Sequence, residues 1–202
     1  VMYDMLGRFA SEDVRDRSVL ALIKRYSGDK KQAKQVVKTS RNLFEQVKAR
    51  LGLSNDDGDL LRRAAFLHEI GLAISHSSYH KHSAYLLEYS DIPGFSQVDQ
   101  KRMAQLMLNH RRKLKADVLE QTCSIGGDQL VHLCLLLRLA VLAHHSRSDQ
   151  ELPDLQLEII DNNHWQITVG DSSEHYAFLL PDLYTEIDQF AKWGVTLNVI
   201  EA

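Results

Sequence analysis

Apolar residues recur every three or four positions through most of the first 147 residues, which is the spacing of one face of an α-helix. In the segment 29–51 this face is formed by Ala33, Val36, Val37, Leu43, Phe44 and Val47. Asp29 before it and Gly52 after it are residue types that begin and end helices. The same spacing predicts helices over about residues 11–23, 29–51, 59–74, 81–89, 96–111 and 128–145.

Alternation of apolar and polar residues replaces the helical spacing after Pro153. It covers two short stretches, which are marked by Leu155, Leu157, Ile159, Trp165, Ile167 and Val169. The turn sequence of residues 161–163 separates the two stretches, so the pattern predicts a β-hairpin. We also predict a strand over residues 176–180, a helix that begins at Pro181 and a last strand over residues 195–200.

The order of these elements predicts a mainly α protein with two domains. An all-α domain covers residues 1–150, and a small α+β domain covers residues 151–202. The first seven residues read as the end of a helix that continues from upstream. We therefore expect the chain to be a fragment of a longer protein.

Composition and charge narrow the classes of function. The 202 residues are 44% hydrophobic and carry a net charge of -3, so no overall basic field points to nucleic acid, and any anion site must be local. The longest apolar run, residues 130–143, contains His132 and Arg138 and is too short and polar for a membrane span. The two cysteines cannot form a disulfide framework, and no signal peptide is visible, so we expect a cytoplasmic protein with neither nucleic acid nor membrane as partner.

Candidate chemistry is densest in residues 64–87, AAFLHEIGLAISHSSYHKHSAYLL. An adjacent His–Glu pair is followed there by three more histidines: His68, Glu69, His76, His80 and His82. A further histidine, His110, follows in an Asn-His-Arg-Arg sequence. Neutral imidazoles and carboxylates that converge from several helices are the ligands of divalent metals in phosphate chemistry.

This pattern resembles the HD superfamily of phosphohydrolases, whose fold is a helical bundle. The resemblance implies metal ligands at His68, Glu69 and His110. The family's first histidine would fall at about residues 39–40 and its last aspartate at Val141, and this chain has neither ligand. We therefore expect no catalytic metal centre. A weak mononuclear site of His68, Glu69 and His110 is one alternative, and a hydrogen-bonded pair of His68 and Glu69 inside the bundle is the other.

A closer resemblance, to the exopolyphosphatase/guanosine pentaphosphate phosphatase (Ppx/GppA) family, covers essentially the whole chain. It rests on the sequences YDMLGRF, DVRDRS, AFLHEIG, HKHSAY, DIPGF and LLRLAV, which begin at residues 3, 13, 65, 80, 91 and 136. That family also departs from the HD metal pattern. The resemblance implies that this chain is the C-terminal part, an HD-like helical domain plus a small α/β end domain, and that it contains no catalytic residue.

The same resemblance implies what the complete protein does. Two actin-like domains upstream would carry the phosphatase site and use Mg²⁺ to release terminal phosphate from polyphosphate or from guanosine pentaphosphate (pppGpp). The C-terminal part would dimerise and extend a groove for polyphosphate. The sequence does not distinguish between polyphosphate and pppGpp as the substrate.

Recognition of a polyphosphate chain requires spaced cationic donors, because the chain offers charge but no base edges. The candidate residues are His76, His80, Lys81, His82, Arg111, Arg112 and Lys113. A solvated helix end and a surface loop are the structural alternatives for these residues. Two other functions stay open, namely an autonomous metal-dependent HD phosphohydrolase that acts on nucleotides and a dimerisation or regulatory module without ligand.

Overall fold

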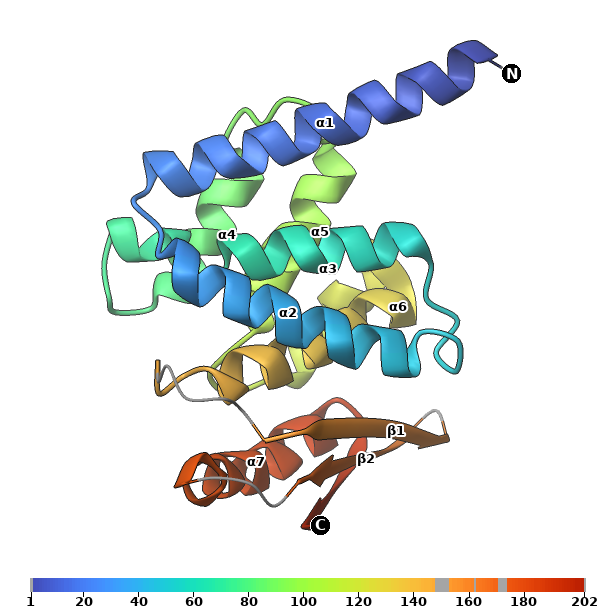
Figure 1. Ribbon diagram of the computed structural model, residues 1–202, viewed down its shortest axis with the longest axis vertical. Helices are drawn as coiled ribbons and strands as arrows, with labels where there is room; N and C mark the ends of the chain where they lie inside the picture. The colour runs from blue at the N-terminus through green and yellow to red at the C-terminus, as the bar shows by residue number, and fades with distance from the viewer. Residues whose placement is uncertain (1, 148–152, 162, 171–173, 202) are drawn as a thin grey trace.

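The structure of the protein is a computed structural model that describes residues 2–147, 153–161, 163–170 and 174–201, without the side chains of residues 2–13 and 174–178. The elements in chain order are α1 (Met2–Arg25), α2 (Lys30–Val47), α3 (Asn55–Leu67), η1 (Ile70–Ala73), α4 (Tyr79–Tyr89), α5 (Gln97–Asn109), α6 (Ala116–Ala143), β1 (Leu155–Asp161), β2 (His164–Val169), α7 (Glu174–Lys192) and β3 (Thr196–Glu201). Figure 1 shows the helical part above and the small α/β part below. The predicted mainly α architecture is confirmed.

Helix α6 forms the centre of the helical part, where it contacts α2, α3 and α5. Its residues from Leu130 to Ala140 are nearly all buried, which explains why this stretch is apolar on every side. Gly127, with a φ of 64°, kinks the helix directly before the predicted helix over residues 128–145. Among the described residues α6 alone is long and apolar enough to cross a membrane, but 61% of its most apolar stretch is buried in the fold, as in the core helix of a globular protein.

Side-chain caps fix where several helices begin. The carboxylate of Asp29 accepts hydrogen bonds from the backbone N–H groups of Lys31 and Gln32, as expected for the residue before α2. Ser96 forms a capping box with Asp99 at the start of α5, where the predicted helix over residues 96–111 begins. Local hydrogen bonds of this kind depend on residues that are close in sequence, so the sequence predicts them well.

Several predicted helix boundaries are wrong. Helix α6 starts at Ala116 and not at residue 128, and α7 starts at Glu174 and not at Pro181. A second capping box, at Ser54, starts α3 at Asn55 and not near residue 59, because the polar stretch that reads as a turn is the first helical turn. The same helix ends at Leu67, and the short helix η1 follows it, so residues 68 and 69 lie at a helix end. Helix α1 starts at Met2 and runs through Ser11, where we predicted its beginning.

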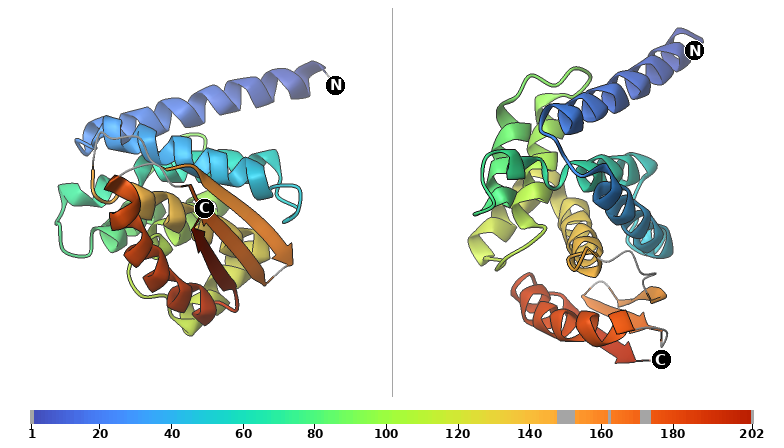
Figure 2. Two further views of the ribbon diagram at one scale, coloured as in Figure 1. Left: turned by 60° about the horizontal axis from the view of Figure 1, so that its bottom comes forward. Right: turned by 60° about the vertical axis from the view of Figure 1, so that its left-hand side comes forward.

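The end part is a three-stranded sheet in the order β1-β2-β3, covered by α7 (Figure 2). The predicted hairpin is confirmed, because β1 and β2 pair antiparallel, and β3 then pairs parallel to β2. Trp165 is fully buried between His132 of α6 and Phe190 of α7.

The strand predicted over residues 176–180 is wrong. These residues belong to α7, and a short apolar run does not distinguish a strand from a buried helix.

Buried polar contacts join the two parts. The guanidinium of Arg138 in α6 pairs with the carboxylate of Glu186 in α7, with Nη2 at 2.8 Å from Oε1 and Nε bonded to Oε2. Trp193 Nε1 donates to the carbonyl oxygen of Lys115 at 3.0 Å, and the Leu114 N–H donates to Gln189 Oε1 at 3.0 Å. The predicted domain boundary near residue 150 lies outside the described residues.

Replacing Glu186 by alanine should lower the free energy of unfolding by about 3–5 kcal/mol, because it leaves the Arg138 guanidinium buried without a counter-charge. Equilibrium unfolding in urea measures the change. The double variant Arg138→Met/Glu186→Leu should recover most of the loss. Glu158→Ala, at an exposed position of β1, is the control and should stay within about 0.5 kcal/mol of the parent chain. Equal stability of the Glu186 and Glu158 variants would contradict the prediction.

Candidate functional site

A polar cavity of about 390 Å³ lies where the ends of several helices meet α7. Its lining combines basic, acidic and imidazole side chains, which are Gln32, His68, Glu69, Leu72, His76, Tyr79, His110, Arg111, Arg112, Arg138, Val141, Leu142, His145, Arg147, Asp182 and Glu186. The cavity therefore brings together the three predicted metal ligands and part of the predicted anion-binding set. For this reason we treat it as the candidate functional site.

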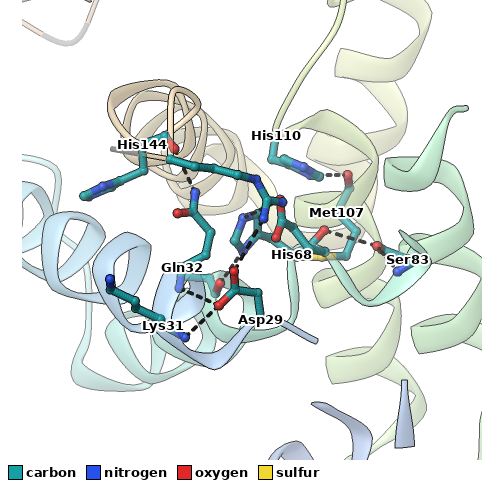
Figure 3. A network of polar contacts seen from close by, with 12 residues as sticks. Asp29, Lys31, Gln32, His68, Ser83, Met107, His110 and His144 are labelled. Atoms are coloured by element: carbon teal, nitrogen blue, oxygen red, sulfur yellow. Dashed lines mark hydrogen bonds and ion pairs between the residues drawn. The ribbon is translucent and has the colours of Figure 1, made fainter. Parts of the chain in front are cut away.

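Two buried histidines occupy equivalent positions at helix ends. His68 follows α3 and His110 follows α5, and each is only 1% exposed. Their Nδ1 atoms lie 2.7 Å from the carbonyl oxygens of Ala65 and Met107, three residues earlier in each case. Figure 3 shows both rings, whose centroids are 5.8 Å apart at 89°. Because a carbonyl only accepts hydrogen bonds, Nδ1 carries the proton and Nε2 is an acceptor without a partner in the structure.

Burial keeps these imidazoles neutral. It lowers the pKa of His68, which the nearby carboxylate of Glu69 raises only in part. It also lowers the pKa of His110 well below its usual range, with His68 as a further cause. Burial together with the cations Arg111 and Lys81 lowers the pKa of His80 to about 4. At neutral pH His68 and His110 therefore offer lone pairs, not imidazolium charges, to the site, and His80 is neutral as well.

Glu69 does not form the predicted hydrogen bond with His68. Their nearest atoms, Oε1 and Nε2, are 3.9 Å apart, which is too long for a hydrogen bond. Glu69 Oε1 instead accepts from Arg147 Nη2 at 2.6 Å, and Oε2 has no partner in the structure. The alternative of a simple His68–Glu69 pair is therefore wrong.

The three predicted metal ligands share one cavity but do not form a closed ligand cage. No group of three His, Cys, Asp or Glu side chains in the described part of the chain is placed to hold a metal ion. Val141 lines the cavity where the HD pattern has its last aspartate. Thr39 stands near the place of the first histidine, and its hydroxyl bonds to His144 Nε2 at 2.8 Å. A weakly bound metal at His68, Glu69 and His110 stays a prediction.

Of the predicted anion-binding residues, His76, Arg111 and Arg112 line the cavity. The Arg111 guanidinium stacks on the Tyr79 ring, 4.3 Å from its centroid. Arg112 has a left-handed φ of 68°, and its carbonyl oxygen accepts from Arg138 Nη2 at 2.5 Å. A stacked ring and a buried guanidinium thus hold the turn that carries the two arginines.

The other predicted anion-binding residues lie outside the cavity lining. His80 is buried behind His110, with ring centroids 6.5 Å apart, while Lys81 and Lys113 are exposed and His82 is half-buried. Sequence reasoning missed two arginines that do line the cavity, Arg138 and Arg147. Arg138 lies in the Leu-Arg-Leu-Ala sequence that carries the family resemblance, whereas nothing in the sequence around Arg147 marks it.

Carboxylates pair with some of the cavity's cations and leave others unpaired. Glu186 binds Arg138, and Glu69 binds Arg147. Arg111 and Arg112 form no ion pair with any carboxylate among the described side chains. Two guanidinium groups are therefore available on the wall of the cavity, and guanidinium is the side chain best suited to phosphate oxygens.

Comparisons with known proteins agree with this picture. The family model described as Ppx/GppA phosphatase, domain III, matches residues 14–186. Proteins named guanosine-5'-triphosphate,3'-diphosphate pyrophosphatase from Aeromonas hydrophila and Pseudoalteromonas translucida are each 33% identical to the chain, and the one from Aeromonas salmonicida is 31% identical. The alignments cover 98–100% of this chain but only 40–41% of each relative, so the chain corresponds to their C-terminal part and spans about two fifths of their length.

The free energy of unfolding should fall as the pH decreases below about 6.5, the ordinary histidine pKa. Below this pH the histidines of the unfolded chain bind protons, whereas His68, His80 and His110 of the folded chain bind them only at lower pH. The unfolded state is therefore favoured, and stability present above pH 6.5 is lost. Each histidine contributes at most about 1.4 kcal/mol per pH unit. Urea unfolding of the parent chain and of His110→Gln at pH 7.5, 6.5 and 5.5 measures this, and the variant should show a shallower dependence.

His76→Gln is the matched control for this experiment, because that ring is exposed in the folded protein as well. It should leave the pH dependence as it is in the parent chain. A His110→Gln variant with the same pH dependence as the parent chain would show that His110 is not held neutral by burial.

Proposed function

Because the chain belongs to the Ppx/GppA phosphatase family, we propose that it is the polyanion-binding C-terminal part of an enzyme that releases phosphate from pppGpp or polyphosphate. The names of the relatives favour a guanosine nucleotide with both a triphosphate and a diphosphate as the substrate. In this proposal the hydrolysis and its Mg²⁺ belong to upstream domains, and this chain supplies no catalytic residue. The complete enzyme would work in the cytoplasm as a homodimer.

The observation that carries the proposal is the pair of cavity arginines without carboxylate partners. Arg111 and Arg112 follow each other on a turn that Tyr79 and Arg138 hold in place. Planar guanidinium groups bind phosphate oxygens through two parallel hydrogen bonds, and a turn that is already ordered loses little entropy on binding. His76, exposed at the same cavity, adds a hydrogen-bond donor.

Residues outside the cavity would serve a longer ligand. Lys113 follows the two arginines directly, and Lys81 and His82 lie on α4 next to Tyr79 and His80. We propose that these side chains extend the path of a polyphosphate beyond the cavity. Their contribution should be smaller than that of Arg111 and Arg112, because exposed charges are screened by salt.

The variant Arg111→Gln/Arg112→Gln should bind long-chain polyphosphate at least about tenfold more weakly than the parent chain, because two charge-assisted contacts are lost. It should also depend less steeply on salt, because fewer counterions are released. Isothermal titration calorimetry at low and moderate salt measures both. Lys34→Gln/Lys38→Gln, which removes the same charge from exposed positions of α2, should have little effect. Equal affinities of the two double variants would reject the cavity as the anion site.

An autonomous HD phosphohydrolase acting on nucleotides is the alternative function, and the unpartnered Nε2 atoms of His68 and His110 beside Glu69 are what favour it. Histidines that ligate metals commonly donate their other N–H to a carbonyl, as these two do. Stoichiometric Mn, Fe or Zn in protein purified without chelator, lost in His68→Ala, would favour this alternative. A chain that binds neither metal nor polyanion would be a dimerisation or regulatory module.

The proposed dimer is tested by sedimentation velocity. At tens of micromolar the chain should sediment with about twice its mass of 23.1 kDa, because a subunit interface that forms in the complete protein is favoured by concentration. A dilution series from this concentration should show the dimer dissociating. A monomer throughout the series would contradict dimerisation through this part of the protein.

A further inference from the structure

Arg147 is the fourth arginine of the cavity, and among the described residues its guanidinium contacts carboxylates only. Its Nη2 donates to Glu69 Oε1 at 2.6 Å, and its Nη1 lies 3.4 Å from Asp29 Oδ2. Its side chain is 47% exposed. It follows the end of α6 and reaches back to the ends of α2 and α3, on the same cavity as Arg111 and Arg112.

A comparison of Arg147 with Arg138 shows which of the two ion pairs could give up its carboxylate to a phosphate. Arg138 is 4% exposed and also donates to the backbone carbonyls of Asn109 and Arg112, so replacing Glu186 by a ligand would disrupt the fold around it. Arg147 has no such backbone bonds among its described contacts. Its guanidinium can be reached from solvent, although the Glu69 carboxylate on the other side of the pair is mostly buried. A phosphate could therefore replace the carboxylates at Arg147 without rearranging the helices.

The two carboxylates would respond differently to such an exchange. Asp29 keeps its role without Arg147, because its other oxygen, Oδ1, accepts the backbone N–H groups of Lys31 and Gln32 (Figure 3). Glu69 is only 11% exposed, and its second oxygen already lacks a partner. Losing Arg147 would leave Glu69 poorly solvated beside an incoming anion. Glu69 is therefore the group that most opposes release of Arg147.

We propose that Arg147 is a phosphate-binding residue of this cavity and that Glu69 occupies it in place of the ligand, so that this internal ion pair sets the affinity for the polyanion. The inference rests on the proposed function, since it requires that the cavity binds a polyanion. It adds a residue from outside the basic cluster and gives a carboxylate of the HD-like motif a role as an internal competitor. The two contacts exchange one for one, with no bond made or broken.

A double-mutant cycle between Glu69→Gln and Arg147→Gln tests the proposal, with long-chain polyphosphate as the probe in calorimetric titrations. Glu69→Gln should bind about three- to tenfold more tightly than the parent chain, because the competitor is gone. Arg147→Gln should bind more weakly by a similar factor. In the Arg147→Gln background, the Glu69 substitution should lose most of its benefit, since the two effects are coupled through one contact.

Asp59→Asn is the matched control, because it removes the same charge from another Arg–carboxylate pair, the partly exposed pair with Arg62 at a second cavity. A gain in affinity as large in Asp59→Asn as in Glu69→Gln would show only a change of net charge and would overturn the inference. Unchanged affinity in Arg147→Gln would overturn it as well, and that test does not depend on the Glu69 variant folding. Absence of binding in the parent chain would instead reject the proposed function.

Discussion

The buried ion pair between Arg138 and Glu186 is the interaction on which the rest of the site depends. One guanidinium contacts the carboxylate of α7, the last carbonyl of α5 and the carbonyl of Arg112. It thereby joins α6 to two segments that are far apart in sequence, namely residues 109–112 and α7. A charge buried to this extent is tolerated only when its hydrogen bonds are satisfied, so these segments must keep their places for the guanidinium to stay paired. The cavity and the turn with Arg111 lie against this contact.

Residues at or just after helix ends supply most of the imidazole and guanidinium groups of the candidate site, while Arg138 and Glu186 come from within helices. His68 and His110 each sit just after a helix and bond back to a carbonyl three residues earlier, so the unsatisfied carbonyls at a helix end orient both rings. Arg111 and Arg112 follow the end of α5, and Arg147 follows the end of α6. Helix ends leave side chains room to converge, whereas the helix faces are occupied by the apolar core.

The sequence predicted what depends on neighbours in the chain and missed what depends on distant ones. The cap at Asp29, the start of a helix at residue 96 and the hairpin follow from local residue types and are confirmed. The family resemblance identified His68, Glu69 and His110, which do share a cavity. The pairing of Glu69 with Arg147, 78 residues away, and that of Arg138 with Glu186, 48 residues away, leave no local pattern. Only the folded arrangement shows which arginines are already paired.

The contacts between the two parts of the molecule also bear on how it unfolds. If the sheet and α7 detached while the helices stayed intact, Arg138 would lose its counter-charge, and the indole N–H of Trp193 and the N–H of Leu114 would lose their acceptors. Trp165 would leave its place between α6 and α7. A partly open state of this kind is costly, so the two parts should melt in one cooperative transition although they look like separate domains in sequence. The end part therefore stabilises the helical part against partial unfolding. Amide hydrogens in α6 and β2 should for this reason exchange with solvent at similar rates.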